Sequence, residues 1–375
     1  MLTGVGHYTL ELARHLANSS ADEIFVVSPR GFIASIESET SGGSNLHLTR
    51  PTISPLTRYW WSIGLPRYIR KNRIEVFHGT NFEVPLRCKC PSVVTIHDLS
   101  MVLHPQTHER RRVRRARRRL PMMTRTATMV ITPTEAVRQE VYQHLEISLD
   151  RIVTIPEAAR SAFRRQDPGL TANVRKRLEI TKPFVLYVGT VEPRKNLLTL
   201  VRAFEDVVSG SDFSLQLVIA GRKGWMVDDL FRQVRQSPVA EQIIFTGYLS
   251  DDDLCALYSS CALFVYLSLY EGFGLPPLEA MACGAPVIAS RIPSLSETIS
   301  EAALLVAPTD VRELARNIRS LLQDEDLRTQ LAKKGAQRAS ELGWDRTAQL
   351  TKAVYDQALT ICRKADMTKA KACFI

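Results

Sequence analysis

Short apolar runs that alternate with amphipathic stretches constrain this sequence more than any other feature. Continuous runs of Val, Ile and Leu separated by helical patterns are typical of parallel strands that helices cover on both faces. The runs form two successive series, and 375 residues are too many for one ordinary core. The sequence therefore predicts two doubly wound, Rossmann-like α/β domains. The expected strands are residues 24–27, 76–78, 93–96, 129–132 and 152–155 in the first series, and 184–188, 215–220, 242–245, 263–267, 286–289 and 303–306 in the second.

A polar and charged stretch near residues 161–183 separates the two series. Pro168 and Gly169 act there as breakers of regular structure. After the second series, apolar residues at helical spacing predict a last helix that packs back toward the first domain. The expected divisions are a first domain over 1–165, a linker over 166–182, a second domain over 183–343, the helix over 344–362 and a polar tail over 363–375.

The start of the chain is unusual for a Rossmann-like domain. Gly4-Val5-Gly6 is followed at helical spacing by Tyr8 and Leu12, as in the turn and first helix of such a unit. A parallel strand should precede that turn, and only three residues do. We therefore expect that the natural start lies upstream of Met1 and that the first domain lacks its first strand here. A short helical start on a smaller sheet is the alternative.

Charge is distributed unevenly along the chain, whose net charge is +10. The first 165 residues contain 24 Lys and Arg against 14 Asp and Glu, whereas the remainder is balanced. An anionic partner would thus meet the first half. No apolar run reaches the length of a membrane helix, and no secretory leader is visible. The cysteines, including the lone C-x-C of Cys88 and Cys90, match no metal or disulfide pattern, so we expect a cytoplasmic setting.

The strongest local feature is a glycine-rich turn between a buried strand and a helix, at residues 268–287. Gly272 and Gly274 permit a sharp turn and the close approach of a ligand. Pro276 and Pro277 suit the first turn of a helix, where a missing N–H has no cost. Such a helix start offers unpaired N–H groups and the positive end of a dipole to an anion.

Two glutamates, Glu271 and Glu279, belong to different parts of this motif. The first precedes the turn and the second lies early in the helix, so they would contact different parts of one extended ligand. Ionised carboxylates accept hydrogen bonds from sugar and ribose hydroxyls. The alternative is two solvated acids at an ordinary helix start.

This segment closely resembles the Glu-x7-Glu signature of the family 4 retaining glycosyltransferases, which have the GT-B fold of two Rossmann-like domains. The similarity covers nearly the whole chain, and the run Gly-Thr-x-Glu-Pro-Arg-Lys-Asn favours the mannosyltransferase-like branch. Ile155-Pro156-Glu157 departs from the family, which more often has Pro-Asn-Gly there. The further matching segments include Gly4-Val5-Gly6-His7-Tyr8, Thr95-Ile96-His97-Asp98, Gly189–Asn196, Leu217–Gly224 and Gly247-Tyr248-Leu249.

The resemblance assigns roles to matching positions. Arg194 and Lys195 would neutralise a leaving diphosphate, Glu271 would contact the donor sugar, and Glu279 would hold the nucleotide ribose. His97 would lie near the reacting sugar, although a lone histidine at a strand end is often structural. We interpret His78, at the end of another expected strand, as structural. The donor-binding set implied is Gly4, Gly6, Gly221, Gly247, Tyr248, Leu249, Phe273, Gly274, Leu275 and Glu279.

The implied chemistry is transfer of a hexose, with mannose favoured, with retention of anomeric configuration. The co-substrate would be a nucleotide sugar, with GDP-mannose favoured and a UDP-sugar as the alternative. The acceptor would be a glycan or lipid-linked glycan in surface polysaccharide synthesis. No cofactor or metal is expected, because the two cations would serve in its place. Asp251-Asp252-Asp253 is interpreted as helix-capping acids after the N-cap Ser250.

An arginine run forms a basic amphipathic helix pattern in which Val113, Ala116 and Leu120 make one thin apolar stripe. Such a helix is typical of binding to an anionic membrane surface, here the inner membrane face. Nucleic acid is not expected, because the run lacks interleaved aromatic residues. Plain solvation is the alternative. The candidate membrane-surface residues are Arg110, Arg111, Arg112, Arg114, Arg115, Arg117, Arg118 and Arg119.

Other interpretations of the whole chain stay open. The first alternative is another GT-B enzyme, such as a sugar-nucleotide epimerase. The second is a catalytically weak GT-B scaffold that binds its ligand without turnover. A phosphorylase would need a pyridoxal-lysine context that we do not find. A nucleic-acid-binding protein would leave Glu271 and Glu279 unexplained.

Overall fold

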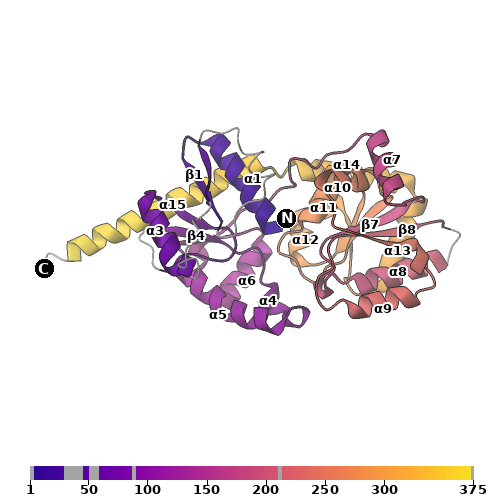
Figure 1. The fold of residues 1–375 in the computed structure, drawn as a ribbon, viewed down its shortest axis with the longest axis horizontal. Coiled ribbons are helices and arrows are strands. Elements are labelled where there is room, and N and C mark those ends of the chain that lie inside the picture. The colour runs from indigo at the N-terminus through magenta and orange to yellow at the C-terminus, as the bar shows by residue number, and fades with distance from the viewer. Residues whose placement is uncertain (1–3, 29–44, 50–58, 87–89, 210–212, 373–375) are drawn as a thin grey trace. The chain divides into compact units, whose positions relative to one another are not determined.

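The computed structural model describes residues 4–28, 45–49, 59–86, 90–209 and 213–372, with side chains through Lys364. The chain divides into two compact units (Figure 1). The first unit comprises Met1–Leu99, Arg115–Glu157 and Gly343–Ile375, and the second comprises Ser100–Arg114 and Ala158–Leu342. Residues 1–3 and Cys88, which bear on the expected upstream strand and on the C-x-C pair, lie outside the described residues.

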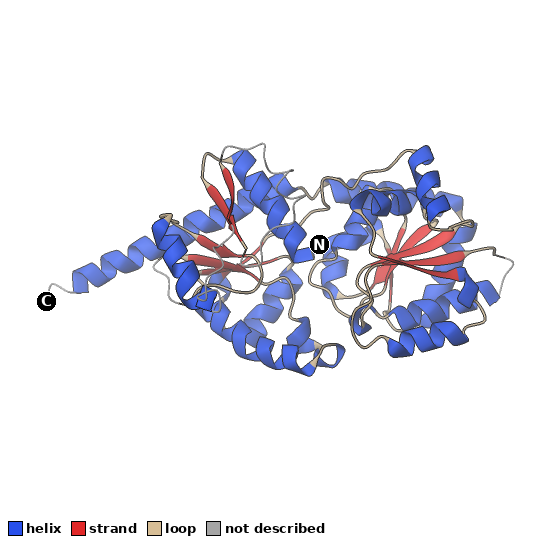
Figure 2. Ribbon diagram, in the orientation of Figure 1, coloured by secondary structure: helices blue, strands red, loops and turns tan. Residues whose placement is uncertain are grey.

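The second unit is built on a parallel six-stranded sheet with helices on both faces (Figure 2). Its strand order is β12-β11-β10-β7-β8-β9, which is the doubly wound order with the switch between β7 and β10. Ligands of such sheets bind at the carboxyl ends of the strands beside that switch. The strands are β7 (Phe184–Val188), β8 (Gln216–Ala220), β9 (Ile243–Gly247), β10 (Leu263–Tyr266), β11 (Val287–Ser290) and β12 (Leu304–Val306).

Helices of the second unit begin at side-chain caps that the sequence supplies. Ser250 accepts a hydrogen bond from the Asp253 amide, and Asp310 and Asp324 cap their helices in the same way. These caps place the helix starts and leave the apolar faces on the sheet. The helices are α7 (Pro168–Arg177), α8 (Leu197–Ser209), α9 (Asp228–Gln236), α10 (Asp251–Ser260), α11 (Leu275–Ala282), α12 (Pro293–Ile299), α13 (Val311–Gln323) and α14 (Glu325–Ser340).

The core of the second unit is the sheet itself. Every residue of β7, β8, β10 and β11 is buried, as continuous apolar strands covered on both faces require. Helix α8 contributes Leu200, Val201 and Phe204, each with no more than 1% of its surface exposed. This packing fixes the strand ends, and therefore the loops that follow them.

The first unit contains two separate parallel sheets in its described part. The larger has the order β3-β4-β5-β6, and the smaller pairs β1 with β2. The strands are β1 (Ile24–Val27), β2 (Leu46–Thr49), β3 (Phe77–Gly79), β4 (Ser92–Thr95), β5 (Met129–Thr132) and β6 (Ile152–Thr154), and the main helices are α1 (Gly4–Ser19), α3 (Leu65–Lys71), α5 (Arg110–Thr126), α6 (Glu135–Leu145) and α15 (Trp344–Ala372). The first residues of α5, up to Arg114, belong to the second unit.

Helix α15 packs against α1 and the larger sheet within the first unit (Figure 1). The Trp344 ring meets the Tyr8 ring edge-on with centroids 5.8 Å apart. Val354 and Ala358 join the buried cluster of Val93, Met129, Ile131 and Ile155. The last element of the chain therefore completes the core of the first unit.

The expected strands each overlap an observed strand within two residues at either end. One observed strand, β2, has no counterpart among the expected strands. Its four residues, Leu-His-Leu-Thr, contain only two apolar side chains. A short strand of this kind gives too little hydrophobic pattern to stand out from a loop.

Three boundaries differ from the expectation. The units divide after Glu157 rather than at residue 165. The expected linker contains α7, because Asp167 caps its start and Pro168 occupies the first turn, where proline favours a helix. Helix α15 continues past Cys362 to Ala372, since the added residues are mostly good helix formers without Gly or Pro. Across the described residues, no helix combines the length and hydropathy needed to span a membrane.

Candidate active site

Three glycines close adjacent strands at the carboxyl edge of the second-unit sheet. Gly189, Gly221 and Gly247 follow or end β7, β8 and β9 with φ of 152°, 146° and 70°. The Gly189 amide donates to the Ala220 carbonyl at 2.9 Å, and the Gly221 amide to the Gly247 carbonyl at 2.8 Å. A Cβ at Gly221 would lie 2.0 Å from the Gly189 oxygen. Only glycine fits there, and the edge is left free of side chains where a ligand would approach.

A buried ion cluster occupies the switch point. Arg194 and Lys195 lie in the turn after β7, and Glu271 lies in the loop after β10. Lys195 Nζ is 2.5 Å from Glu271 Oε1, and Arg194 Nη1 is 2.9 Å from Glu271 Oε2. Lys195 also donates to the Tyr266 hydroxyl at 2.6 Å, and Arg194 binds Glu192 at 2.8 Å. Two cations and two carboxylates thus form one preorganised group.

The charges of this cluster set its protonation states. Burial alone would raise the pKa of Glu271, but the nearby charges of Arg194 and Lys195 lower it to about 2. Burial lowers the pKa of Lys195, as does the Arg194 charge, and Glu271 opposes both effects. Glu271 is therefore ionised at neutral pH. An incoming diphosphate would compete with the Glu271 carboxylate for Arg194 and Lys195. Because a diphosphate carries more negative charge than one carboxylate, it would compete effectively.

The turn from Glu271 to α11 is fixed by packing. Gly274 is the N-cap of α11 with φ of 104°, and a Cβ there would lie 2.4 Å from the Leu295 side chain. Ser294 Oγ donates to the Glu271 carbonyl at 2.5 Å. Pro276 and Pro277 occupy the first turn as expected. Because the two prolines have no N–H, this helix start presents the Gly274 and Leu275 amides and the positive end of the helix dipole.

Glu279 is buried on α11 and is held by Arg160. Arg160 Nε lies 2.7 Å from Glu279 Oε1, and Arg160 Nη1 lies 2.7 Å from Asp251 Oδ1. The guanidinium also covers the Phe163 ring at 4.2 Å. Burial raises the pKa of Glu279, and the Arg160 charge opposes the increase. Arg160 therefore holds Glu279 as part of an ion pair on α11.

The loops after β8 and β9 contribute a planar surface. The Tyr248 side chain is 47% exposed, and the Arg222 guanidinium lies 5.7 Å from its ring centroid. Leu249, which follows Tyr248 in the chain, is buried, and Phe273 is buried in the turn before α11. An exposed aromatic ring with a stacked cation suits a flat heteroaromatic ligand.

His97 follows β4 in the first unit and contacts groups on three other segments. Its Nδ1 lies 2.8 Å from Glu157 Oε1, and its Nε2 lies 2.9 Å from the Thr80 carbonyl. Tyr8 packs edge-on against the ring at 4.7 Å. Burial alone would lower the pKa of His97, but the hydrogen bond and charge of Glu157 raise it above its usual value.

His78 lies in a different hydrogen-bond network of the same unit. Its Nδ1 is 2.7 Å from the Tyr355 hydroxyl on α15, and its Nε2 is 2.7 Å from Thr95 Oγ1. Burial lowers the pKa of His78 to about 3. The ring is neutral, and hydrogen bonds at both of its nitrogens connect α15 to the sheet. This arrangement favours the structural interpretation of His78.

Gly4 and Gly6 begin α1 in the first unit, and a Cβ at Gly4 would touch nothing within 4 Å.

Helix α5 places seven of the eight candidate arginines in exposed positions and leaves Arg119 half-buried. Glu83 lies 3.0 Å from Arg119 and 3.4 Å from Arg115, and Glu109 lies 2.6 Å from Arg112. Val113 and Leu120 are buried, so the apolar stripe faces the protein.

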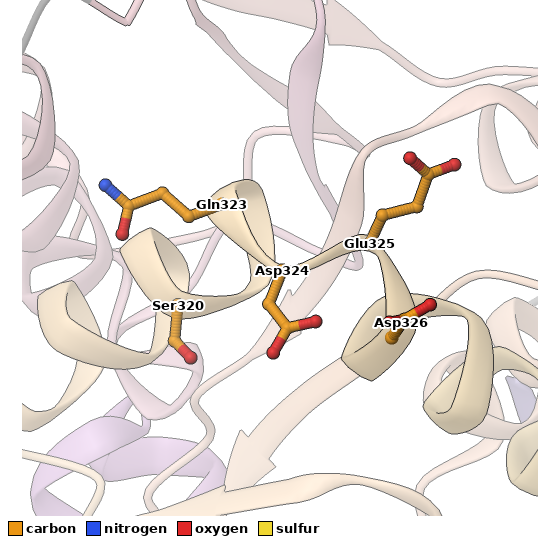
Figure 3. A pocket seen from close by; sticks show the side chains of 5 residues that line it. All are labelled: Ser320, Gln323, Asp324, Glu325 and Asp326. Carbon is orange, nitrogen blue, oxygen red and sulfur yellow. The ribbon is translucent and has the colours of Figure 1, made fainter.

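A hollow between α13 and α14 is not part of this site (Figure 3). Its volume is about 610 Å³, and it is lined by Ser320, Gln323, Asp324, Glu325 and Asp326. Asp324 caps α14, and its neighbours are ordinary acids of a first helical turn. Among the described side chains, no group of three His, Cys, Asp or Glu is arranged to hold a metal ion.

Comparison with known proteins identifies the family. The model described as "Glycosyltransferase Family 4" matches residues 2–159, and the model "Glycosyl transferases group 1" matches residues 171–338. The chain is 32% identical over 356 residues to O-antigen chain mannosyltransferase B of Escherichia coli, covering 92% of this chain and 93% of that protein. The chain belongs to glycosyltransferase family 4.

Within family 4 the chain falls in the mannosyltransferase branch. It is also 31% identical over 250 residues to the serotype-specific mannosyltransferase WbdA of Escherichia coli, of which it spans about a third. Sucrose-phosphate synthase from Thermosynechococcus elongatus has a similar structure, with a TM-score of 0.76 at 23% identity over 96% of this chain and 94% of that one. The predictions of a GT-B fold, a family 4 glycosyltransferase and a mannosyltransferase relationship are confirmed.

The structure adds residues that the sequence did not single out. Glu157 pairs with His97, and Arg160 pairs with Glu279. Glu192 and Tyr266 complete the ion cluster. The sequence offered one indication of the first pair, because Ile155-Pro156-Glu157 departs from the family motif by placing an acid there.

Proposed function

We propose that this glycosyltransferase moves a mannosyl residue from a nucleotide-diphosphate donor, with GDP-mannose favoured, to a glycan or lipid-linked glycan acceptor in surface polysaccharide synthesis. The observation that carries the proposal is the cluster of Arg194, Lys195 and Glu271 at the switch point of the second-unit sheet. The printed names of the relatives, two mannosyltransferases of which one acts on O-antigen chains, support the sugar and the product class.

The donor diphosphate binds at the side-chain-free edge formed by Gly189, Gly221 and Gly247. Arg194, Lys195 and the Gly274 and Leu275 amides at the start of α11 stabilise its charge. Glu279 accepts from the ribose hydroxyls, and the Tyr248 ring stacks on the base. Glu271 and the turn at Phe273 and Gly274 contact the sugar.

In the reaction, the bond from the anomeric carbon to the diphosphate oxygen breaks and a bond to the acceptor oxygen forms, with retained configuration. Negative charge grows on the leaving diphosphate, where Arg194 and Lys195 already stand. Preorganised cations in a buried site stabilise developing charge without reorganisation, typically by several kcal/mol. No metal ion is needed for that role. As the new bond forms, the acceptor hydroxyl passes its proton to the oxygen of the leaving diphosphate.

The transfer assay that tests this uses the full chain with GDP-mannose, UDP-glucose and UDP-galactose and a short mannose-terminated glycan. Proton NMR of the product reports the anomeric configuration, and added EDTA tests the metal requirement. Transfer from GDP-mannose with an α product in EDTA is expected. An inverted product or activity lost in EDTA would contradict the mechanism, and binding without transfer would favour the scaffold interpretation.

We also propose that the exposed face of α5 docks on an anionic membrane surface. Arg114, Arg117 and Arg118 lie exposed on this helix, and each cation near such a surface contributes about 1 kcal/mol. Replacing all three by Gln should reduce co-sedimentation with vesicles containing 30% anionic lipid by at least about tenfold. Equal binding to neutral and anionic vesicles would contradict the electrostatic interpretation.

A further inference from the structure

Both ring nitrogens of His97 face oxygen atoms that accept hydrogen bonds. Nε2 lies 2.9 Å from the Thr80 carbonyl, which has no hydrogen to donate. Nδ1 lies 2.8 Å from Glu157 Oε1, and an ionised carboxylate also only accepts. Beside an ionised Glu157, a ring that carries hydrogen on both nitrogens satisfies both contacts, whereas either neutral tautomer leaves one contact repulsive.

We propose that Glu157 is a positioning residue that holds His97 as a doubly protonated imidazolium cation, so that His97 acts as a hydrogen-bond donor and never as the general base of the transfer. This inference rests on the proposed function and on the place near the reacting sugar that the family resemblance implies for His97. The protonation state itself is a property of the first unit and is measurable without any substrate.

The surroundings of the ring support the charged form. The titratable groups that face it are Glu157 from the segment after β6, Asp98 from its own loop, Tyr8 from α1 and His78 from β3. Burial raises the pKa of the Tyr8 phenol, so this group stays neutral, and His78 stays neutral because burial lowers its pKa to about 3. The two remaining groups are carboxylates, and Glu157 is 4% exposed. A carboxylate at this distance from the imidazole favours the protonated, charged form of the ring.

The chemical consequence follows from the hydrogen positions. An imidazolium has no lone pair with which to take the proton of an acceptor hydroxyl. When substrate binds, the Nε2 hydrogen is free to exchange the Thr80 carbonyl for a substrate oxygen, while Glu157 keeps its hold on Nδ1. A charged donor makes the stronger hydrogen bond, roughly twice that of a neutral one.

The charge of Glu157 can be removed without changing the length of its side chain. In Glu157→Gln the amide oxygen still accepts a hydrogen bond but brings no charge, so the ring would titrate nearer its ordinary range.

The direct test is the titration of His97 by nitrogen and carbon NMR in the full chain, with His97→Asn to assign the resonance. In the wild type both ring nitrogens should show imidazolium shifts at pH 7. Glu157→Gln should move the titration of the ring to lower pH, and Glu157→Asp should restore part of the difference. A neutral tautomer in the wild type, or no change in Glu157→Gln, would overturn the proposal. If Glu157→Gln does not fold, the wild-type shifts decide alone.

The pH dependence of transfer separates the donor role from the base role by its sign. With a required imidazolium, activity is lost as pH rises, and Glu157→Gln moves that loss to lower pH. At pH 8 we expect kcat to fall about tenfold or more relative to the wild type, with a smaller loss at pH 5.5 and little change in KM. A general base would instead make Glu157→Gln relatively more active at low pH, which would overturn the inference. Absence of transfer in the wild type would count against the proposed function and leave the NMR result standing.

Discussion

Replacing Arg160 by Met measures how much the free energy of unfolding falls when Glu279 is buried without its cation. Arg160 binds Glu279 at 2.7 Å and Asp251 at 2.7 Å, and the Arg160 and Glu279 side chains are 9% and 5% exposed. Met keeps the volume against Phe163 and removes the charge. Breaking a buried pair by removing one partner costs about 3–5 kcal/mol. We expect about 3 kcal/mol, because Asp251 is 39% exposed and regains water.

The pH dependence of this loss has a definite sign. In the folded chain burial raises the pKa of Glu279 and Arg160 opposes it, so Arg160→Met raises it further. A carboxyl with a raised folded pKa holds its proton more tightly in the folded than in the unfolded state. Its destabilising effect is therefore greatest above the folded pKa, and it decreases as the pH falls toward the unfolded value of about 4.3. Arg160→Met should lose most stability at pH 8 and clearly less at pH 5.

Hydrogen exchange of the α11 amides, read by mass spectrometry, gives the local free energy of opening alongside denaturant unfolding of the full chain. Arg177→Met is a matched control, because Arg177 pairs with Asp253 with its side chain 58% exposed and should cost less than about 1 kcal/mol. Adding Glu279→Gln to Arg160→Met should recover part of the loss. Equal losses at pH 5 and pH 8, or no recovery in the double variant, would refute the reasoning.

Gly221→Ala should destabilise the chain by about 2–4 kcal/mol, seen in denaturant unfolding, because its Cβ would lie 2.0 Å from a backbone oxygen at φ of 146°. Gly274→Ala should cost less, about 1–3 kcal/mol, since the Cβ would meet the Leu295 side chain, which can move; a greater loss than Gly221→Ala would contradict this ranking. Tyr248→Ala should leave the melting temperature unchanged and weaken donor binding about tenfold by calorimetry, and unchanged affinity would remove Tyr248 from the base site.

The fold was predictable because its signal lies in the chain order of apolar runs. Continuous Val, Ile and Leu stretches such as Phe184–Val188 have one stable placement, inside a sheet covered on both faces. Strand β2 escaped prediction because two leucines in four residues carry no comparable signal. Helix α7 was interpreted as a linker because Pro168 was taken for a breaker, although Asp167 before it makes proline a helix-starting residue.

The candidate site was predictable only as far as motif residues reach. The sequence placed Arg194, Lys195 and Glu271 near strand ends, and the parallel sheet brings those ends together. It gave no indication that the two cations bind Glu271 itself. The pairing of Glu157 with His97 joins positions 60 residues apart, and local patterning carries no information about such contacts. Partners of this kind depend on the packing of strands β4 and β6.

Calorimetric titration of the full chain with GDP-mannose, UDP-glucose and UDP-galactose, compared with Lys195→Ala, tests the central claim most directly. We predict selective binding of GDP-mannose and at least about tenfold weaker binding in Lys195→Ala, the loss of one charge-assisted contact to the diphosphate. Binding of a folded chain to none of these donors, or unchanged affinity in Lys195→Ala, would contradict the assignment of the donor site to the cluster of Arg194, Lys195 and Glu271.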